Sequence, residues 1–162
     1  MSSPQGNGVL TIRSFEVSPL FASQSLVYRI GAETYEHDPY AGFIVSPDRA
    51  LEIPVRAYLR NSGAFRGVAE PGSLLQADRL LEVRVSELYG DLRTPSKPVA
   101  VLSMRFIFFQ AEKGKPTVPS LDKNYTRRVE LQENTAASVV AGWNKALAEI
   151  MGEVASELAV VK

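Results

Sequence analysis

The sequence predicts an α+β fold, a mixed β-sheet with two helices packed on one of its faces. The elements follow the order strands, one helix, several strands and a long final helix. With 162 residues the chain can bury the core of one domain without disulfides or a metal. No internal repeat or interdomain linker interrupts it. We therefore predict a single domain over residues 9–162, preceded by a disordered segment over residues 1–8.

The first strand and a hairpin are predicted near the N-terminus. Apolar residues alternate over residues 9–17, and the side on which they fall changes near Arg13-Ser14, which indicates a β-bulge. Two further strands, over residues 26–30 and 33–36, flank Gly31-Ala32. A two-residue connection with glycine first is typical of a type II′ hairpin turn.

A helix start follows at Ser46, with Pro47 in the first turn and Asp48 near the positive end of the helix dipole. Apolar residues at helical spacing continue to Gly63, which is expected to end the helix. Pro54 lies inside this pattern and removes a backbone donor. We therefore expect the helix to be kinked or broken there.

The second half of the chain reads as strands followed by a helix. Residues 65–70 can form a short strand, and residues 81–89 alternate between apolar and polar. Residues 99–109 are apolar on nearly every position, which predicts a central strand. A last strand over residues 125–131 follows a turn at Lys113-Gly114-Lys115.

The C-terminal segment predicts a long amphipathic helix over about residues 135–158 that lies on the sheet. Its apolar residues form one stripe: Val140, Trp143, Leu147, Ile150, Val154 and Leu158.

Composition excludes several function classes. Lys plus Arg and Asp plus Glu balance at 18 each, so a nucleic-acid partner lacks its main electrostatic support. Cysteine is absent, which excludes disulfides, thiolate metal sites and a cysteine nucleophile. No leader or stretch of eighteen apolar residues is present, and the start resembles a chain cut just after a removed leader.

Catalytic chemistry has little support in the sequence. The single histidine, His37, lies between Glu36 and Asp38 and is either a general base oriented by a carboxylate or a solvated residue at the hairpin. No nucleophile elbow, phosphate-binding loop or metal-ligand spacing occurs. We predict no enzyme, no catalytic residue, no cofactor and no metal.

Aromatic side chains gather in the otherwise polar segment before the first helix. They either form an amphipathic surface for a partner or lipid, or complete the core under a long loop. Arg127-Arg128 either contacts lipid headgroups or is a solvated rim, since adjacent strand residues point to opposite faces. The candidate residues for binding a partner or lipid are Phe21, Tyr28, Arg29, Tyr35, Tyr40 and Phe43.

Several stretches, in order over about residues 9–158, resemble the ABC-type transport auxiliary lipoprotein component family, which includes the paraquat-inducible protein C group. No single stretch is a catalytic signature, so their order and spacing carry the resemblance. The stretches are Leu26-Val27-Tyr28-Arg29 with Tyr35, Tyr40 and Phe43; Leu59, Ser62-Gly63 and Phe65; Pro71-Gly72-Ser73; Ala77-Asp78, Leu81-Glu82 and Leu88-Tyr89-Gly90-Asp91; and Trp143-Asn144-Lys145-Ala146-Leu147.

The resemblance implies a fold similar to the N-terminal domain of TolB. It also implies a lipoprotein anchored in the outer membrane and facing the periplasm. The lipid-bearing cysteine of that family is absent from this sequence, so the anchor rests on the resemblance alone. The expected partners are a mammalian-cell-entry (MCE) type substrate-binding protein and its ABC permease and ATPase. We therefore expect a non-catalytic accessory that docks a lipid transporter to the outer membrane. The alternative is direct carriage or conduction of phospholipid or another hydrophobic molecule, and self-association is a further expectation.

Overall fold

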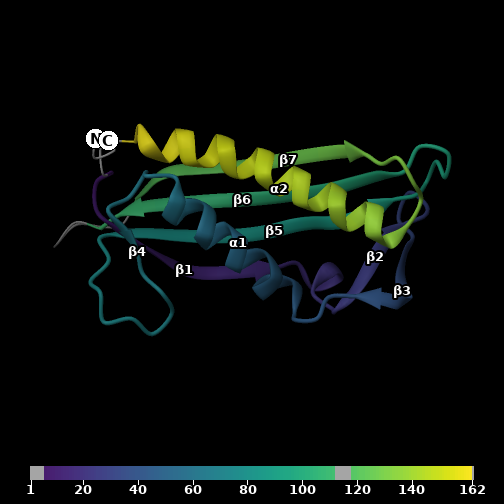
Figure 1. Ribbon diagram of the computed structural model, residues 1–162, viewed down its shortest axis with the longest axis horizontal. Coiled ribbons are helices and arrows are strands. Elements are labelled where there is room, and N and C mark those ends of the chain that lie inside the picture. The colour runs from purple at the N-terminus through teal and green to yellow at the C-terminus, as the bar shows by residue number, and fades with distance from the viewer. Residues whose placement is uncertain (1–5, 112–117, 162) are drawn as a thin grey trace.

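The computed structural model describes residues 6–111 and 118–161. One seven-stranded sheet carries both α-helices on the same face, which confirms the predicted α+β architecture (Figure 1). We call this the helix side of the sheet and the opposite face the helix-free side. The elements are β1 (Val9–Val17), the 3₁₀ helix η1 (Pro19–Phe21), β2 (Ser25–Arg29), β3 (Tyr35–Gly42), α1 (Pro47–Asn61), β4 (Gly67–Val68), β5 (Arg79–Asp91), β6 (Val99–Gln110), β7 (Pro119–Glu130) and α2 (Ala136–Ala159).

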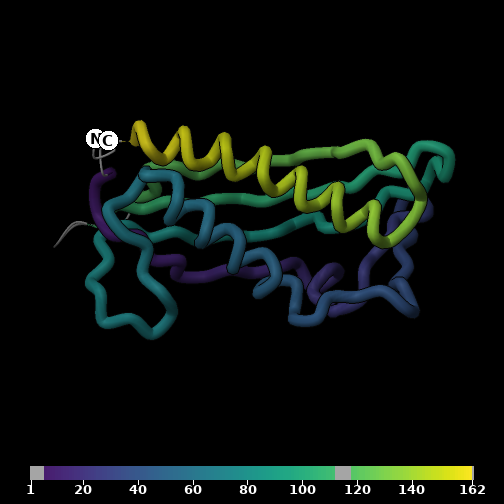
Figure 2. Tube along the Cα trace, in the orientation of Figure 1, coloured from purple at the N-terminus to yellow at the C-terminus, as the bar shows by residue number. Residues whose placement is uncertain are grey.

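Strand β5 is the axis of the sheet. On one side it pairs antiparallel with β6, which in turn pairs with β7. Along its other edge β5 pairs first with β1 and then, further along its length, with β2, and both strands run parallel to it. Strand β4 lies beyond β1, and β3 lies beyond β2. The β2–β3 hairpin therefore lies at one end of the sheet, away from the two chain termini (Figure 2).

The first strand and the central strand confirm the sequence prediction. β1 spans Val9–Val17, and its register with β5 shifts between Ile12 and Ser14, where the bulge was expected. β6 lies between β5 and β7. Its residues on the helix side are all fully or almost fully buried: Ala100, Leu102, Met104, Phe106 and Phe108.

The predicted break in the first helix is wrong, because α1 continues through Pro54. Pro54 lies on the exposed side of α1, where water can hydrogen-bond the backbone carbonyl that loses its donor. Asn61 is the last helical residue, and Gly63 follows with a φ of +76°, a conformation that favours glycine.

The predicted two-residue turn in the hairpin is also wrong. β2 ends at Arg29 and β3 begins at Tyr35, with the Ile30 amide donating to the Thr34 carbonyl at 2.9 Å. Within the described residues, Gly31 is not among the glycines with positive φ, which a type II′ turn would require. The Arg29 guanidinium donates to the carbonyls of Gly31 and Ala32, so this side chain stabilises a wider loop.

The last predicted turn, at residues 113–115, lies outside the described residues. The short strand predicted over residues 65–70 is reduced to β4, Gly67–Val68. The strand predicted over residues 81–89 is longer at both ends, as β5.

Helix α2 confirms the long C-terminal helix. The Thr135 side chain caps it by accepting a hydrogen bond from the Ser138 amide at 3.2 Å. The buried stripe differs at its start, where Val139 is buried in place of Val140. The physical reason is the contact of Gly142 with the sheet, which sets the rotation of the helix. A Cβ at Gly142 would lie 2.6 Å from the Ala100 Cβ.

We expect Gly142→Ala to lower the free energy of unfolding by about 1–3 kcal/mol, because the Ala100 Cβ cannot rotate away from the added methyl group. Gly152→Ala is the matched control in the same helix. Its added Cβ would meet only the Tyr58 hydroxyl, at 3.5 Å, so helix propensity should stabilise it by about 0.5–1 kcal/mol. Urea unfolding of both variants measures the difference. Equal midpoints for the two variants would contradict the close approach at Gly142.

Candidate functional site

The candidate site is the hairpin end of the molecule, defined by the β2–β3 hairpin and the turn over residues 92–98 that joins β5 to β6. Two residue pairs hold these parts together, Tyr28 with Gly90 and Arg29 with Asp91. A Cβ at Gly90 would meet Val139 of α2, so Gly90 faces the helix side. Its neighbours Tyr89 and Asp91 therefore point to the helix-free side.

On the helix-free side, three aromatic rings pack against one another. Phe21 lies 5.8 Å from Tyr35 and 5.6 Å from Tyr89, and the last two rings are 5.7 Å apart, measured between centroids. The Arg29 guanidinium carbon lies 5.8 and 5.9 Å from the centroids of Tyr35 and Tyr89. Phe21 and Tyr89 are buried, so this cluster is the small core of the hairpin end, with a cation over it.

On the helix side, Tyr28 donates a 2.5 Å hydrogen bond to the Asp38 carboxylate. Burial, and then this carboxylate, raise the pKa of Tyr28 above its ordinary value. The Ala41 amide, followed by the Tyr28 hydroxyl, lowers the pKa of Asp38. Phe43 stacks on Trp143 of α2 at 5.8 Å, so both side chains attach the hairpin end to the rest of the fold.

Around these two anchors, between Asp38 and Phe43 and directly after Phe43, the chain presents apolar side chains to solvent. Tyr40 is 97% exposed and Ile44 is 98% exposed, and Val45 is exposed as well. We call residues 38–45, which comprise the end of β3 and the three residues that follow it, the display loop. Tyr40 and Ile44 are almost completely exposed, whereas Phe43 packs on Trp143, so residues 38–45 combine an anchor with exposed apolar side chains.

The backbone of the display loop is held at both ends. Asp38 Oδ1 accepts hydrogen bonds from the amides of Tyr40 and Ala41 at 2.8 and 2.9 Å. The Phe43 amide donates to the Gln24 carbonyl at 2.6 Å, and the Gln24 side chain donates to the Ile44 carbonyl at 3.2 Å. The exposed side chains of the display loop are therefore carried on an ordered backbone.

A polar hollow of about 370 Å³ lies next to the β5–β6 turn. At its base the Asp91 carboxylate, 5% exposed as a residue, accepts two hydrogen bonds from the Arg93 guanidinium, at 2.9 and 2.7 Å, and one from Arg128 at 2.9 Å. The Arg93 side chain, and to a smaller degree Arg128, hold the pKa of Asp91 far below its usual range, while burial opposes this shift. We call this feature the Asp91 hollow. Its lining residues are Asp91, Arg93, Thr94, Lys97, Val99 and Arg128.

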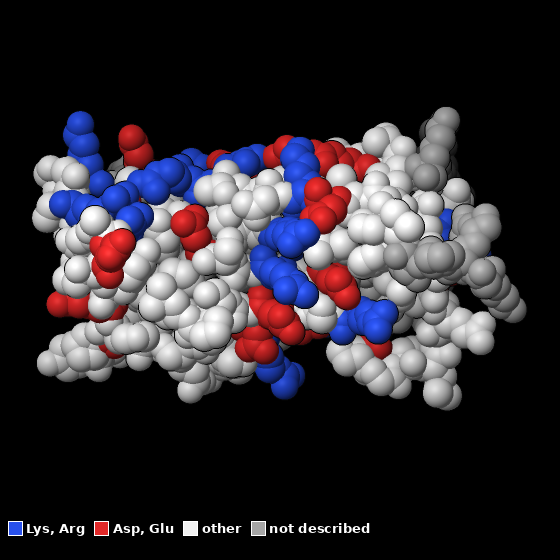
Figure 3. Space-filling model, turned by 180° about the vertical axis from the view of Figure 1, so that it is seen from behind, with Lys and Arg blue, Asp and Glu red and all other residues white. Residues whose placement is uncertain are grey.

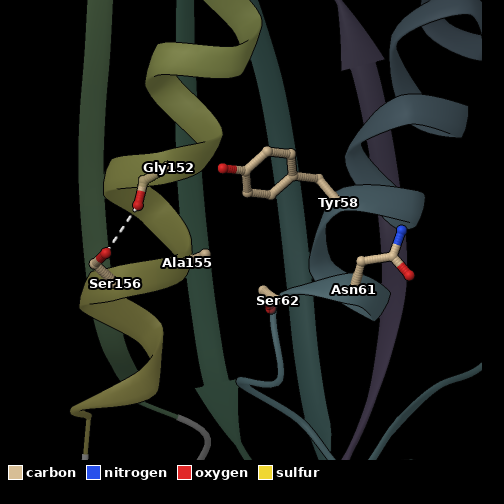
Figure 4. A pocket seen from close by; sticks show the side chains of 6 residues that line it. All are labelled: Tyr58, Asn61, Ser62, Gly152, Ala155 and Ser156. Carbon is tan, nitrogen blue, oxygen red and sulfur yellow. Dashed lines mark hydrogen bonds between the residues drawn. The ribbon is translucent and has the colours of Figure 1, made fainter.

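A second hollow, of about 460 Å³, separates the two helices. Figure 4 shows the Tyr58 ring of α1 projecting across it towards α2, and Ser156 bonded to the Gly152 carbonyl of its own helix. Its lining residues are Tyr58, Asn61, Ser62, Gly152, Ala155 and Ser156. None of these side chains carries a charge at neutral pH, so the hollow offers no ionic group to a ligand.

His37 is exposed on β3, where its Nδ1 lies 3.3 Å from the Ser23 hydroxyl. Among the described residues, no carboxylate lies within hydrogen-bonding distance to orient its ring. The described part of the chain also holds no group of three or more His, Asp or Glu residues that could ligate a metal. No helix in that part is long and apolar enough to cross a membrane.

The six residues predicted to bind a partner or lipid separate into three groups. Phe21, Tyr35 and Arg29 meet on the helix-free side, and Tyr28 and Phe43 pack on the helix side. Tyr40 alone among them is fully displayed.

Most of these six side chains therefore fit the alternative in which the aromatic residues complete the core. A binding role for the six residues stays a prediction. Neither hollow is lined by any of the six, so carriage of lipid between these rings also stays a prediction.

Sequence reasoning missed two parts of the site. Ile44 could have been found from the apolar run Phe43-Ile44-Val45 directly before the helix cap. The Asp91 hollow could not be found from residues 91–99 alone, because Arg128, which completes it, comes from β7. Arg127 and Arg128 do point to opposite faces: Arg127 pairs with Glu149 and Glu153 of α2, and Arg128 pairs with Asp91.

No protein-family model and no curated protein matches this sequence. Several solved structures are similar to it. Protein XCC0632 from Xanthomonas campestris, which carries the family designation DUF330, has a TM-score of 0.83 at 18% identity, covering 98% of this chain and 87% of that chain. An uncharacterized protein gives 0.73 at 16% identity, covering 96% and 94%. The hypothetical protein CT253 from Chlamydia trachomatis gives 0.61 at 12% identity, covering 95% and 98%. At these identities the likeness establishes a shared fold.

Asp91→Asn should lower the free energy of unfolding by about 2 kcal/mol at pH 7, because it removes the buried negative charge and one of the two oxygens that accept from Arg93 and Arg128. The pKa of Asp91 is depressed in the folded state, so the ionised carboxylate stabilises the fold fully at pH values well above the ordinary carboxyl value of 3.8. This stabilisation is lost gradually as the pH falls from there towards the lower pKa of the folded state. The difference between wild type and variant should therefore narrow below about pH 4.

Urea unfolding at pH 7, 4 and 3 measures this difference. Asp122→Asn, which breaks the exposed pair with Arg105, is the control and should have a smaller effect. An equal loss of stability in the two variants would show that the Asp91 cluster adds no more than a surface ion pair.

Proposed function

We propose that this protein is a non-catalytic accessory lipoprotein of the bacterial envelope, which docks an ABC transporter with an MCE-type substrate-binding protein to the outer membrane. In this role the chain faces the periplasm and contributes a binding surface rather than a reaction. The transported molecule is a phospholipid or another hydrophobic compound.

Three lines of reasoning support this proposal. The ordered stretches from Leu26 to Leu147 resemble those of the auxiliary lipoprotein family, whose members work in such transporters. The fold agrees with the sheet and two helices expected for that family, and XCC0632 shares it over nearly the whole chain. In the described residues the lone His37 lacks an orienting carboxylate, which is consistent with a binding role.

The observation that carries the docking role is the display loop. Tyr40 and Ile44 expose almost their entire side chains, although each could be buried at a gain of about 1.5–3 kcal/mol. The hydrogen bonds of Asp38 and Gln24 hold the backbone beneath them, so little conformational entropy is lost on binding. An exposed tyrosine on an ordered backbone is typical of a protein-binding hot spot.

We expect the double variant Tyr40→Ser, Ile44→Ser to bind the purified periplasmic domain of the MCE-type protein at least about tenfold more weakly than wild type. Biolayer interferometry with the purified domains measures the affinity.

The matched control is Leu74→Ser, Leu75→Ser, which removes two exposed leucines from the loop between β4 and β5. This loop lies at the other end of the molecule (Figure 1), so the control variant should bind like wild type. If wild type fails to bind, the docking function is wrong. If both double variants bind equally weakly, the display loop is not the docking surface.

A further inference from the structure

We propose that the Asp91 hollow binds a phosphate group, carried either by a lipid headgroup or by a free phosphate. The inference rests on the arrangement of Arg93, Lys97 and Arg128 around one buried carboxylate, and it does not depend on the docking function.

The Asp91 carboxylate orients two guanidinium groups towards the same space. Arg93 uses its Nε and one Nη to form a bidentate pair with Asp91, and Arg128 reaches the same Oδ2 from β7 with one Nη. The acid lies at the buried base, whereas the side chains of Arg93 and Arg128 are 39% and 49% exposed. Negative charge is therefore inside the hollow wall, and positive charge faces outwards.

The cluster carries more positive charge than its structure needs. Three cations, Arg93, Lys97 and Arg128, line the hollow beside one carboxylate, which leaves a net charge of +2 (three minus one). In the described part of the chain, no carboxylate other than Asp91 lies within 4 Å of these three cations. A single arginine would be enough to compensate the buried Asp91. The second arginine and the lysine therefore add a positive field within a partly enclosed space.

The hydrogen-bonding groups that remain match a tetrahedral oxyanion. Arg93 keeps its second Nη, and Arg128 keeps its Nε and second Nη, none of which bonds to another described residue. Lys97 and Thr94 line the same space, and their side chains carry further donors. Donors from several directions suit the three or four oxygens of a phosphate better than the two of a carboxylate, and guanidinium groups pair bidentately with phosphate.

The position of the hollow leaves it accessible. It lies at the hairpin end, and basic side chains gather at the upper left of the helix-free side in Figure 3, which corresponds to this end. The middle of that face differs, because acidic and basic side chains alternate across it. There Arg105 is paired bidentately with Asp122, at 2.7 and 2.6 Å. The charge is therefore balanced on the open sheet and in excess at the hollow.

The test uses two probes, one for each source of phosphate. Inorganic phosphate is titrated into ¹⁵N-labelled protein, and the shifts of the Arg93, Thr94 and Lys97 amides give the dissociation constant. Vesicles of phosphatidylglycerol mixed with phosphatidylcholine, and vesicles of phosphatidylcholine alone, are used for co-sedimentation. Sulfate and acetate titrations separate phosphate binding from general attraction of anions.

We expect Arg128→Gln and Lys97→Gln each to weaken phosphate or vesicle binding by about tenfold, the effect of losing one hydrogen bond to a charged group. Arg105→Gln is the matched control, because it removes the same charge from the same side of the sheet. It should change binding less than twofold.

Asp91→Asn distinguishes an oriented site from a diffuse positive patch. It raises the net charge of the hollow to +3, so a diffuse patch would bind more tightly. If Asp91 orients the two guanidinium groups, the variant should bind about fivefold more weakly instead, because the arginines must then be ordered by the ligand. Amide spectra confirm that the variant is folded at the titration temperature.

Each outcome decides the proposal. Binding to phosphatidylglycerol vesicles without binding of inorganic phosphate supports a lipid headgroup, and the reverse supports free phosphate. Absence of both, equal effects of Arg105→Gln and Arg128→Gln, or equally strong acetate binding would overturn the proposal. Loss of phosphate binding with intact capture of the MCE-type protein would leave the docking function standing, so the two proposals fail separately.

Discussion

The structure depends on the close contact between α2 and the sheet at Gly142. Because glycine has no side chain, the helix backbone approaches β6 until Ala100 fills the space, and this contact sets the rotation of the helix. The rotation brings Trp143 over β5, where its indole N–H donates to the Tyr89 carbonyl at 3.1 Å. Phe43 then stacks on the indole ring, which fixes where the display loop leaves the hairpin. One small residue in α2 thereby positions an exposed loop about one hundred residues earlier in the chain.

At the hairpin end, consecutive residues of β5 alternate between the two faces of the sheet, so this one strand contributes to the packing on both faces. Gly90 leaves room on the helix side for Tyr28 and Val139, while Tyr89 and Asp91 on either side of it point the other way. Tyr89 is the base of the aromatic cluster, and Asp91 is the base of the cationic hollow. Three consecutive residues of β5 therefore connect the packing of the hairpin, the display loop and the charged hollow.

The sequence predicts the fold well where burial repeats with a clear period. The strand over residues 9–17, the central strand and the C-terminal helix follow from such patterns, and the bulge follows from the change of side near Ser14. The hairpin turn was not predictable from Gly31-Ala32, because the long side chain of Arg29 reaches across and satisfies the loop carbonyls. The effect of Pro54 depended on whether it faced solvent, which sequence periodicity alone left undecided.

The candidate site was only partly predictable from the sequence, because it depends on how strands that are distant in the sequence pair with one another. Aromatic residues before the first helix were visible as a group, but their division between two faces of the sheet depends on the register of β2 with β5. The Asp91 hollow required Arg128 of β7 to meet residues 91–99, and a single pair such as Arg127-Arg128 could indicate only that one of the two arginines faces away from α2.

The serial pairing of β1 and β2 along the same edge of β5 has a consequence for how the molecule moves. β1 is joined to β5 by seven residue pairs, whereas β2 is joined to it by two. The β2–β3 hairpin is thus a small cooperative unit on a stable sheet, able to open locally while the remaining strands keep their hydrogen bonds. In evolution such a unit can change its sequence and length without disturbing the core, which allows a common scaffold to acquire different recognition surfaces at one end.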